Sequence, residues 1–201
     1  MNRKVRVAVF VSGGGTNLQS LIDACSQDDY PAEIVLVVSS SKKAYGLERA
    51  KKRSIPTAVM RKKDFASHDE YADALLNCLT EHDVELICLA GYLKLVPSNV
   101  VRRFKSRILN IHPALLPKFG GKGMYGIRVH EAVIAAGEKE SGPTIHFVDE
   151  IYDHGSIFMQ RKVPVRPDDT PDDLQKRVLL EEHKIYPDAL REVAEKIISE
   201  E

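Results

Sequence analysis

An asparagine and a histidine two positions apart have the types and the spacing for chemistry at a carbonyl group. They are Asn110 and His112, in the segment LNIHPALLPKFGG (residues 109–121). The apolar residues 108–111 predict a buried strand, on which side chains two apart point to the same side. Pro113 keeps His112 on extended backbone, at the carboxyl end of the strand, where open α/β sheets bind their ligands. Taken alone, the pattern more often marks a core histidine beside a turn residue.

A carboxylate near the imidazole would complete a proton-transfer pair, because an opposite charge raises the pKa of a histidine. Asp153, in the acidic turn 149–155, is the candidate, with a solvated turn residue as the alternative. Asn110 would add an oxyanion-hole donor, which is worth ~3 kcal/mol when well placed. The three residues together favour acyl transfer without a protein nucleophile, since the sequence has no G-x-S-x-G elbow.

A glycine-rich turn, SGGGTN at 12–17, follows the apolar strand predicted at 5–11. A turn between a strand and a helix aims backbone N–H groups and the positive helix end at an anion. Leu18 stands where a dinucleotide motif needs glycine, no Walker A sequence is present, and the second strand ends in serines instead of an acidic residue. The turn therefore predicts a site for a single phosphate, with a plain turn capped by Thr16 or Asn17 as the alternative.

Strands and helices alternate through the first half of the chain. This order predicts an α/β fold with a doubly wound, mostly parallel, Rossmann-like sheet. The predicted strands are 5–11, 33–39, 57–60, 86–90, 108–111, 144–148 and 156–165. The predicted helices are 18–25, 46–53, a segment from the Ser67–Glu70 capping box to about 81, 97–104, 129–136, and 171–186, which Pro187 interrupts before it resumes.

The composition argues against several classes of partner. The 201 residues contain 29 Lys plus Arg, 29 Asp plus Glu and no Trp, whereas nucleic-acid binders usually show a basic excess and stacking aromatics. The amino terminus lacks the pattern of a signal peptide, and no apolar run approaches the ~20 residues that cross a bilayer. We therefore expect a soluble, cytoplasmic protein without nucleic-acid or membrane partners, with buried, reduced thiols at Cys25, Cys78 and Cys88.

Four glycines lie between residues 118 and 128, at positions 120, 121, 123 and 126. Such a segment predicts a mobile surface loop beside the site, and a lid and a linker are equally good interpretations.

Five sequence blocks make the chain resemble the phosphoribosylglycinamide formyltransferases over nearly its full length. The blocks are SGGGTNLQ (12–19), LAGYLKLV (89–96), LNIHPALLPKF (109–119), HFVDEIYDHG (146–155) and EEHKIYP (181–187). The resemblance implies one formyltransferase domain over residues 1–201, with antiparallel strands added in its second half. Residues up to about 105 would bind phosphate, and those from about 106 would hold the catalytic and folate sites. The implied co-substrate is 10-formyltetrahydrofolate, without a metal, and the implied assembly is a monomer or homodimer.

The resemblance also implies a role for each matching residue. Asn110 would orient the formyl carbonyl, His112 would act as general acid, and Asp153 would hold His112 protonated. The other implied contacts fall into three sets: Gly15, Thr16 and Asn17 on the phosphate; Glu182 on the glycinamide; and Leu93, Lys94, Leu95, Val96, Asn110, Glu150, Ile151, Tyr152 and Asp153 on the folate. His146 would lie behind the catalytic residues or in the core. Relatives often carry a folate-binding cation near 67–70, where this chain has His68, with Arg61, Lys62 and Lys63 upstream.

Four other functions fit some of these residues. A 10-formyltetrahydrofolate hydrolase would share the Asn-His-Asp set, but normally adds an amino-terminal domain. A methionyl-tRNA formyltransferase normally adds a basic carboxyl-terminal domain. A non-catalytic phosphosugar-binding module would use only the glycine turn. A metal hydrolase would need His112, His146, Asp153 and His154 as ligands, although their spacing matches no recognised motif.

Overall fold

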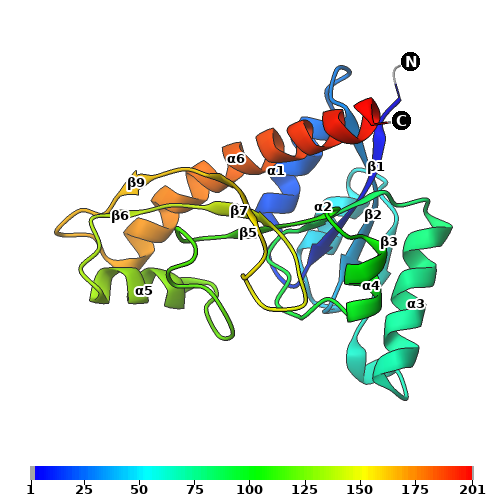
Figure 1. Cartoon of the computed structure of the whole chain (residues 1–201), viewed down its shortest axis with the longest axis horizontal. Helices are drawn as coiled ribbons and strands as arrows, with labels where there is room; N and C mark the ends of the chain where they lie inside the picture. Colours follow the sequence, from blue (N-terminus) through cyan, green and yellow to red (C-terminus); the bar gives the residue numbers. More distant parts are fainter. Residues whose placement is uncertain (1–2, 201) are drawn as a thin grey trace.

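A computed structural model describes residues 3–200, and its main element is a sheet with strand order β3-β2-β1-β4-β5-β7-β8 (Figure 1). The strands from β3 to β5 in that order are parallel, and β7 and β8 extend the sheet in antiparallel fashion. The predicted doubly wound, mostly parallel sheet with antiparallel additions is confirmed. The strands are β1 (Val5–Val11), β2 (Ala32–Ser39), β3 (Thr57–Val59), β4 (Leu86–Leu89), β5 (Ile108–His112), β7 (Thr144–Phe147) and β8 (Ile157–Gln160).

Helices cover both faces of this sheet, so its central strands are apolar on both sides. Val7 and Val9 of β1 face a cluster that includes α1 and the long helix α6. Ala8 and Phe10 face the opposite cluster, which includes α3 and α4 (Figure 1). The helices are α1 (Thr16–Cys25), α2 (Gly46–Lys51), α3 (His68–Glu81), α4 (Ser98–Arg103), α5 (Ile127–Ala135) and α6 (Pro171–Ser199), with a 3-10 turn η1 (Lys62–Asp64).

The strand predicted at 156–165 is in fact two strands in two sheets. β8 ends at Gln160, and β9 (Val163–Pro164) pairs with β6 (Glu140–Ser141), a short strand that the sequence does not reveal. The peptide N–H of Arg161 bonds to the Pro143 carbonyl between the two pairings. Strand partners are set by tertiary packing, so a continuous β-type pattern did not show this change of partner.

Pro187 does not interrupt the last helix, contrary to the prediction. α6 continues through it from Pro171 to Ser199. A proline inside a helix costs ~3 kcal/mol or more, through a lost hydrogen bond and a steric clash. On one side of the helix around it, Ile185, Tyr186, Ala189 and Leu190 are fully buried. The Tyr186 hydroxyl lies 3.1 Å from the carbonyl oxygens of both Leu89 and Leu109. This packing holds the helix together across the proline.

The prediction that all three cysteines are buried is wrong for two of them. Cys88, on β4, is fully buried, but Cys25 and Cys78 are only partly buried. Each packs against the margin of one of the two core clusters that cover the sheet. Burial still raises the pKa of all three thiols.

Candidate active site

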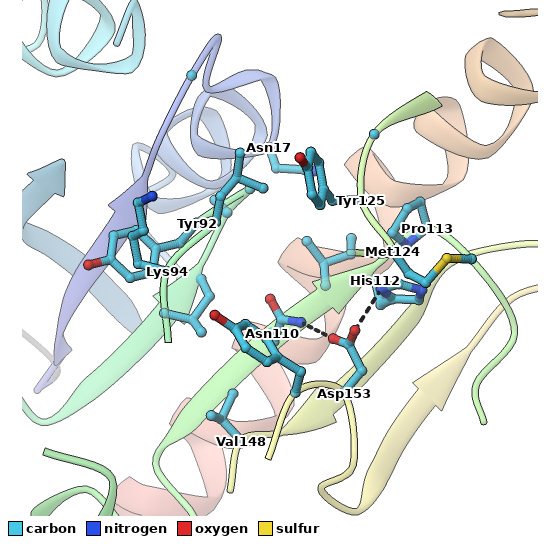
Figure 2. Close-up of a pocket in the computed structure, with 18 of the residues that line it drawn as sticks. Asn17, Tyr92, Lys94, Asn110, His112, Pro113, Met124, Tyr125, Val148 and Asp153 are labelled. Carbon is cyan, nitrogen blue, oxygen red and sulfur yellow. Dashed lines mark hydrogen bonds and ion pairs between the residues drawn. The ribbon is translucent and has the colours of Figure 1, made fainter. Parts of the chain in front are cut away.

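The carboxyl ends of β1, β4 and β5 open into a pocket of about 860 Å³ (Figure 2). Segments from both halves of the chain line it, namely residues 13–17, 89–96, 110–113, 121–126, 148–149 and 151–153. Gln175, Leu179 and Glu182 of α6 also line it. The pocket therefore forms where the sequence predicts a ligand, at the carboxyl edge of a parallel sheet.

Asn110 and His112 lie on β5 and face the same pocket, as their spacing predicts (Figure 2). Asp153 reaches them from the turn after β7. Its Oδ2 lies 3.5 Å from Nδ1 of His112, and its Oδ1 lies 3.3 Å from Nδ2 of Asn110. Asp153 has a positive φ of 53°, a conformation that asparagine and aspartate tolerate better than most residues. The three predicted catalytic residues form one buried cluster.

The amide nitrogen of Asn110 is fully engaged within the protein. It donates to Asp153 and also to Nε2 of His146 at 2.9 Å, while Nδ1 of His146 donates to its neighbour's backbone, the Phe147 carbonyl. An amide nitrogen has two N–H groups, so neither is free. The amide oxygen faces the open pocket (Figure 2). To serve as an oxyanion donor, Asn110 must exchange one of these bonds when substrate binds.

Burial lowers the pKa of His112, and the attraction of Asp153 only partly opposes this effect. Nε2 of His112 donates to the Phe119 carbonyl at 2.8 Å, an interaction that also favours the charged ring. Asp153 acts in the predicted direction, but burial outweighs it, so this arrangement favours neutral imidazole. Burial alone would raise the pKa of Asp153; contacts with His146 and His112 and the N–H of Gly121 lower it, keeping this carboxylate charged.

The glycine turn leads directly into α1, and its last glycine is dictated by geometry. Gly15 is the N-cap residue with φ 70°, and a Cβ there would lie 2.8 Å from the Cα of Gly46. No side chain caps the helix, so the alternative in which Thr16 or Asn17 caps it is wrong. The first N–H groups of α1 are left for a ligand.

Asn17 joins the turn to the far end of the chain. Its Nδ2 donates to Oε2 of Glu182 at 2.6 Å, and its buried Oδ1 has no hydrogen-bond partner in the described chain. Burial raises the pKa of Glu182, and the bond from Asn17 only partly offsets this. Glu182 is thereby fixed in the pocket wall beside the turn.

The opposite end of the pocket has an apolar, accessible rim. Leu93 and Leu95 are 48% and 45% exposed, and Ile151 is 61% exposed. Ser12 fixes the first of these segments, because its hydroxyl accepts the N–H of Leu93 at 2.9 Å. Exposed apolar side chains around a cavity suit a flat heterocycle.

Comparisons with known proteins agree with this geometry. Residues 5–190 match the family model described as formyl transferase. The chain is 47% identical over 197 residues to the chloroplastic phosphoribosylglycinamide formyltransferase of Arabidopsis thaliana, covering 98% of this chain and 68% of that protein. It is 45% identical over 182 residues to the phosphoribosylglycinamide formyltransferase of Haemophilus influenzae, covering 90% and 84%. The chain belongs to the phosphoribosylglycinamide formyltransferase family. Among solved structures, glycinamide ribonucleotide transformylase 1 from Symbiobacterium toebii matches with a TM-score of 0.90 and 40% identity, over 98% of this chain and 90% of that one.

Most of the site residues that the family resemblance implied line the pocket, and Glu150 is the exception. Gly15, Thr16, Asn17, Glu182, Leu93, Lys94, Leu95, Val96, Asn110, His112, Ile151, Tyr152 and Asp153 all line it. The carboxylate of Glu150 lies 3.3 Å from Arg102, outside the lining. Its neighbours in the turn face the pocket, whereas its own side chain points outward.

Several cations in or near the family motifs lie outside the pocket lining. Lys118, inside the central motif, pairs with Glu138 at 2.8 Å and does not line the pocket. Arg61 pairs with Asp64 at 2.5 Å, and neither it nor His68 lines the pocket. Lys94 is the cation at the apolar rim.

Sequence reasoning missed several pocket residues. Met124 and Tyr125 come from the glycine-rich loop between residues 118 and 128 (the glycine loop), His130 comes from α5, and Gln175 comes from α6. The glycine spacing marked the loop, but not which of its side chains would turn inward.

Metal and membrane features are absent from the part of the chain that the structure covers. Among residues 3–200, no three His, Cys, Asp or Glu side chains form a group that could hold a metal ion. In the same range, no helix combines the length and apolar composition required to cross a bilayer.

Proposed function

We propose that this protein transfers the formyl group of 10-formyltetrahydrofolate to the amine of N1-(5-phosphoribosyl)glycinamide, in purine biosynthesis. The proposal rests on one observation: the Asn110–His112–Asp153 cluster lies in the same pocket as the glycine turn 13–17, which has the geometry to bind a phosphate. The names of its relatives support the same reaction. The two halves then divide the work: residues to about 105 hold the phosphate, and the remainder holds the folate and the catalytic cluster.

The ribonucleotide would lie along the wall that joins the turn to α6. Backbone N–H groups of Gly15 to Asn17 and the positive end of α1 bind its phosphate. Glu182, held by Asn17, accepts a hydrogen bond from the glycinamide. Both anchors lie away from the reacting amine, so their binding energy serves to position it.

The folate would lie across the apolar rim. Leu93, Leu95, Val96, Ile151 and Tyr152 contact the pterin, and Lys94 provides positive charge at the same end of the pocket. The side chain of Glu150 has no part in this contact, because it faces Arg102.

Transfer begins when the glycinamide nitrogen attacks the formyl carbon. Negative charge then develops on the formyl oxygen, and Asn110 and protonated His112 stabilise it. The attacking nitrogen loses a proton through Asp153, and the folate nitrogen gains one as its bond to carbon breaks. His146 holds Asn110 in place by accepting its amide N–H at 2.9 Å.

The proposed setting is the cytoplasm, with small molecules as partners and a monomer or homodimer as the working form. The plant relative is named as chloroplastic, so a fractionation experiment with tagged protein decides the compartment. Size-exclusion chromatography with light scattering decides the oligomeric state.

A spectrophotometric assay with both substrates tests the function. We expect turnover only when ribonucleotide and formyl folate are both present, and a fall of about 10²- to 10⁴-fold in His112→Ala, the usual range for losing a general acid. His82→Ala is the matched control, since His82 lies at the end of α3 outside the pocket. Folate deformylation without ribonucleotide would instead support the hydrolase, and phosphosugar binding without turnover would support the binding module.

A further inference from the structure

The glycine loop carries an aromatic side chain with an unused polar end. Tyr125 is 44% exposed and lines the same pocket as the turn at 13–17. In the view of Figure 2 its ring lies at the end of the pocket where Asn17 is found. Its hydroxyl has no hydrogen-bond partner among residues 3–200. Because Tyr125 lines the pocket, this unpaired hydroxyl can donate to a ligand there without first breaking a bond within the described residues.

The same loop also carries positive charge without a carboxylate partner. The guanidinium of Arg128 lies 5.3 Å from the centre of the Tyr125 ring, a cation–π contact. Neither Arg128 nor Lys122 forms an ion pair within the described range, and Lys122 lines the pocket. These two cations flank Tyr125 on a segment in which residues 119–130 contain no acidic side chain.

The cation beside the glycine turn is committed to holding the turn itself. Nε of Arg49 donates to the Gly14 carbonyl at 2.9 Å, and its Nη1 donates to Gln19 at 3.1 Å. Arg49 thus braces the turn from a separate groove and does not line the pocket. A phosphate on the turn would meet backbone N–H groups there, with the charge of Arg49 behind the turn, while Lys122 lines the pocket from the opposite wall.

We propose that Tyr125 is a specificity-determining residue for the phosphate of the ribonucleotide. Its phenol O–H donates to a phosphate oxygen, Lys122 in the pocket lining adds positive charge, and Arg128 packs on the Tyr125 ring. The phosphate is then held between two walls, the turn 13–17 and the loop 121–128. This inference rests on the proposed function, since it assigns the second wall of the same phosphate site.

The start of the glycine-rich loop is hydrogen-bonded to the catalytic residues, so a change further along the loop can affect phosphate binding without moving them. The Phe119 carbonyl accepts from His112 at 2.8 Å, and the Gly121 N–H donates to Asp153 at 2.9 Å. Gly121, Gly123 and Gly126 all have positive φ, which gives the segment after this anchor freedom to adjust. Loss of the Tyr125 hydroxyl therefore removes a phosphate contact and leaves the catalytic cluster in place.

Tyr125→Phe tests the proposal, with Tyr45→Phe as the matched control. Tyr45 is also exposed, at 51%, and lies outside the pocket. We expect Tyr125→Phe to raise the KM for the ribonucleotide about tenfold, equivalent to ~1.4 kcal/mol. The KM for formyl folate and kcat should stay within about threefold, because the catalytic anchors are unchanged.

Ribose 5-phosphate provides a readout that needs no turnover. Calorimetry should show its Kd rising by the same factor in Tyr125→Phe, with a further loss in Arg128→Gln, and no change in Tyr45→Phe. A Kd and KM within twofold of the unaltered protein in Tyr125→Phe would overturn the assignment. Absence of ribonucleotide-dependent transfer in the unaltered protein would overturn the proposed function instead, and the ribose 5-phosphate titration would still decide the role of Tyr125.

Discussion

Replacement of Gly15 by alanine should damage both the fold and the phosphate site. Gly15 has φ 70°, and an added Cβ would lie 2.8 Å from the Cα of Gly46, a backbone atom that no side-chain rotation can move. The Gly46 N–H also donates to the Gly13 carbonyl at 3.1 Å. Relief of the contact therefore requires the start of α2 to move away from the turn.

The cost can be worked from these two features. A left-handed conformation costs an L-residue ~1–2 kcal/mol, and forced overpacking adds ~1–3 kcal/mol. The reduced entropy of the unfolded chain returns ~0.4–1 kcal/mol. The net loss for Gly15→Ala is roughly 1–5 kcal/mol, and a chain of this size loses ~2–4 °C in Tm per kcal/mol. We expect Tm to fall by roughly 2–20 °C.

Thermal denaturation of Gly15→Ala beside Gly13→Ala isolates the effect. A Cβ at Gly13 would meet nothing within 4 Å, and its φ is not in the left-handed region, so its stability should change by less than ~1 kcal/mol. The ribonucleotide KM should also rise in Gly15→Ala, because the N–H groups of the turn move with the backbone. Equal Tm values for the two variants would refute the argument that position 15 requires glycine because of its backbone conformation and its close approach to Gly46.

Three further predictions concern titrating groups. Asp153→Asn should lower the pKa of His112, since the opposing carboxylate is removed while burial remains; histidine titration by NMR measures this, and an unchanged pKa would eliminate the pairing. Burial, and to a lesser extent the charge of His112, lowers the pKa of His130 to about 4. As the pH falls below ~6.5, His130 therefore gains its proton in the unfolded chain before it does so in the folded one. The free energy of unfolding falls accordingly as the pH drops toward 4. At ~1.4 kcal/mol per pH unit, His130→Gln should remove up to ~3 kcal/mol of that fall in urea unfolding, and parallel profiles would count against it. Burial raises the pKa of Glu182, so protonated Glu182 stabilises the folded protein fully below about pH 4.5, and this stabilisation is lost as the pH rises through the raised pKa. Glu182→Gln should therefore be more stable than the unaltered protein at pH 7 but not at pH 4. An equal difference in stability at the two pH values would contradict this.

The parallel core of the fold could be predicted because its signals are local. β1 is mostly apolar and β4 wholly so, and the helices between the parallel strands begin or end near glycine, proline and capping residues. The second half is less predictable, because its pairings depend on distant partners. Two features of this half depend on contacts between residues far apart in the sequence, which a local pattern does not reveal. They are the pairing of β6 with β9 and the continuation of α6 through Pro187.

The catalytic pair was predictable for a related reason. Asn110 and His112 share one strand, so a period of two residues places both in the pocket. Asp153 could be proposed only as a candidate, because its approach depends on the turn after β7. The hydrogen bond between Asn17 and Glu182 joins residues 165 positions apart, and the sequence around each residue does not indicate that they are in contact. Tyr125 was missed because a glycine-rich loop has no periodicity to show which side chains turn inward.

The catalytic cluster is arranged for binding first and chemistry second. Both N–H groups of Asn110 are committed to Asp153 and His146, and burial holds the pKa of His112 down. Each of these features opposes the charge distribution that the proposed transition state needs. An oxyanion near Asn110 and His112 would reverse both effects, since it would attract an N–H from the amide and a proton to the imidazole. The cluster is therefore expected to reach its active protonation state only with both substrates in place, which would limit loss of the formyl group to water.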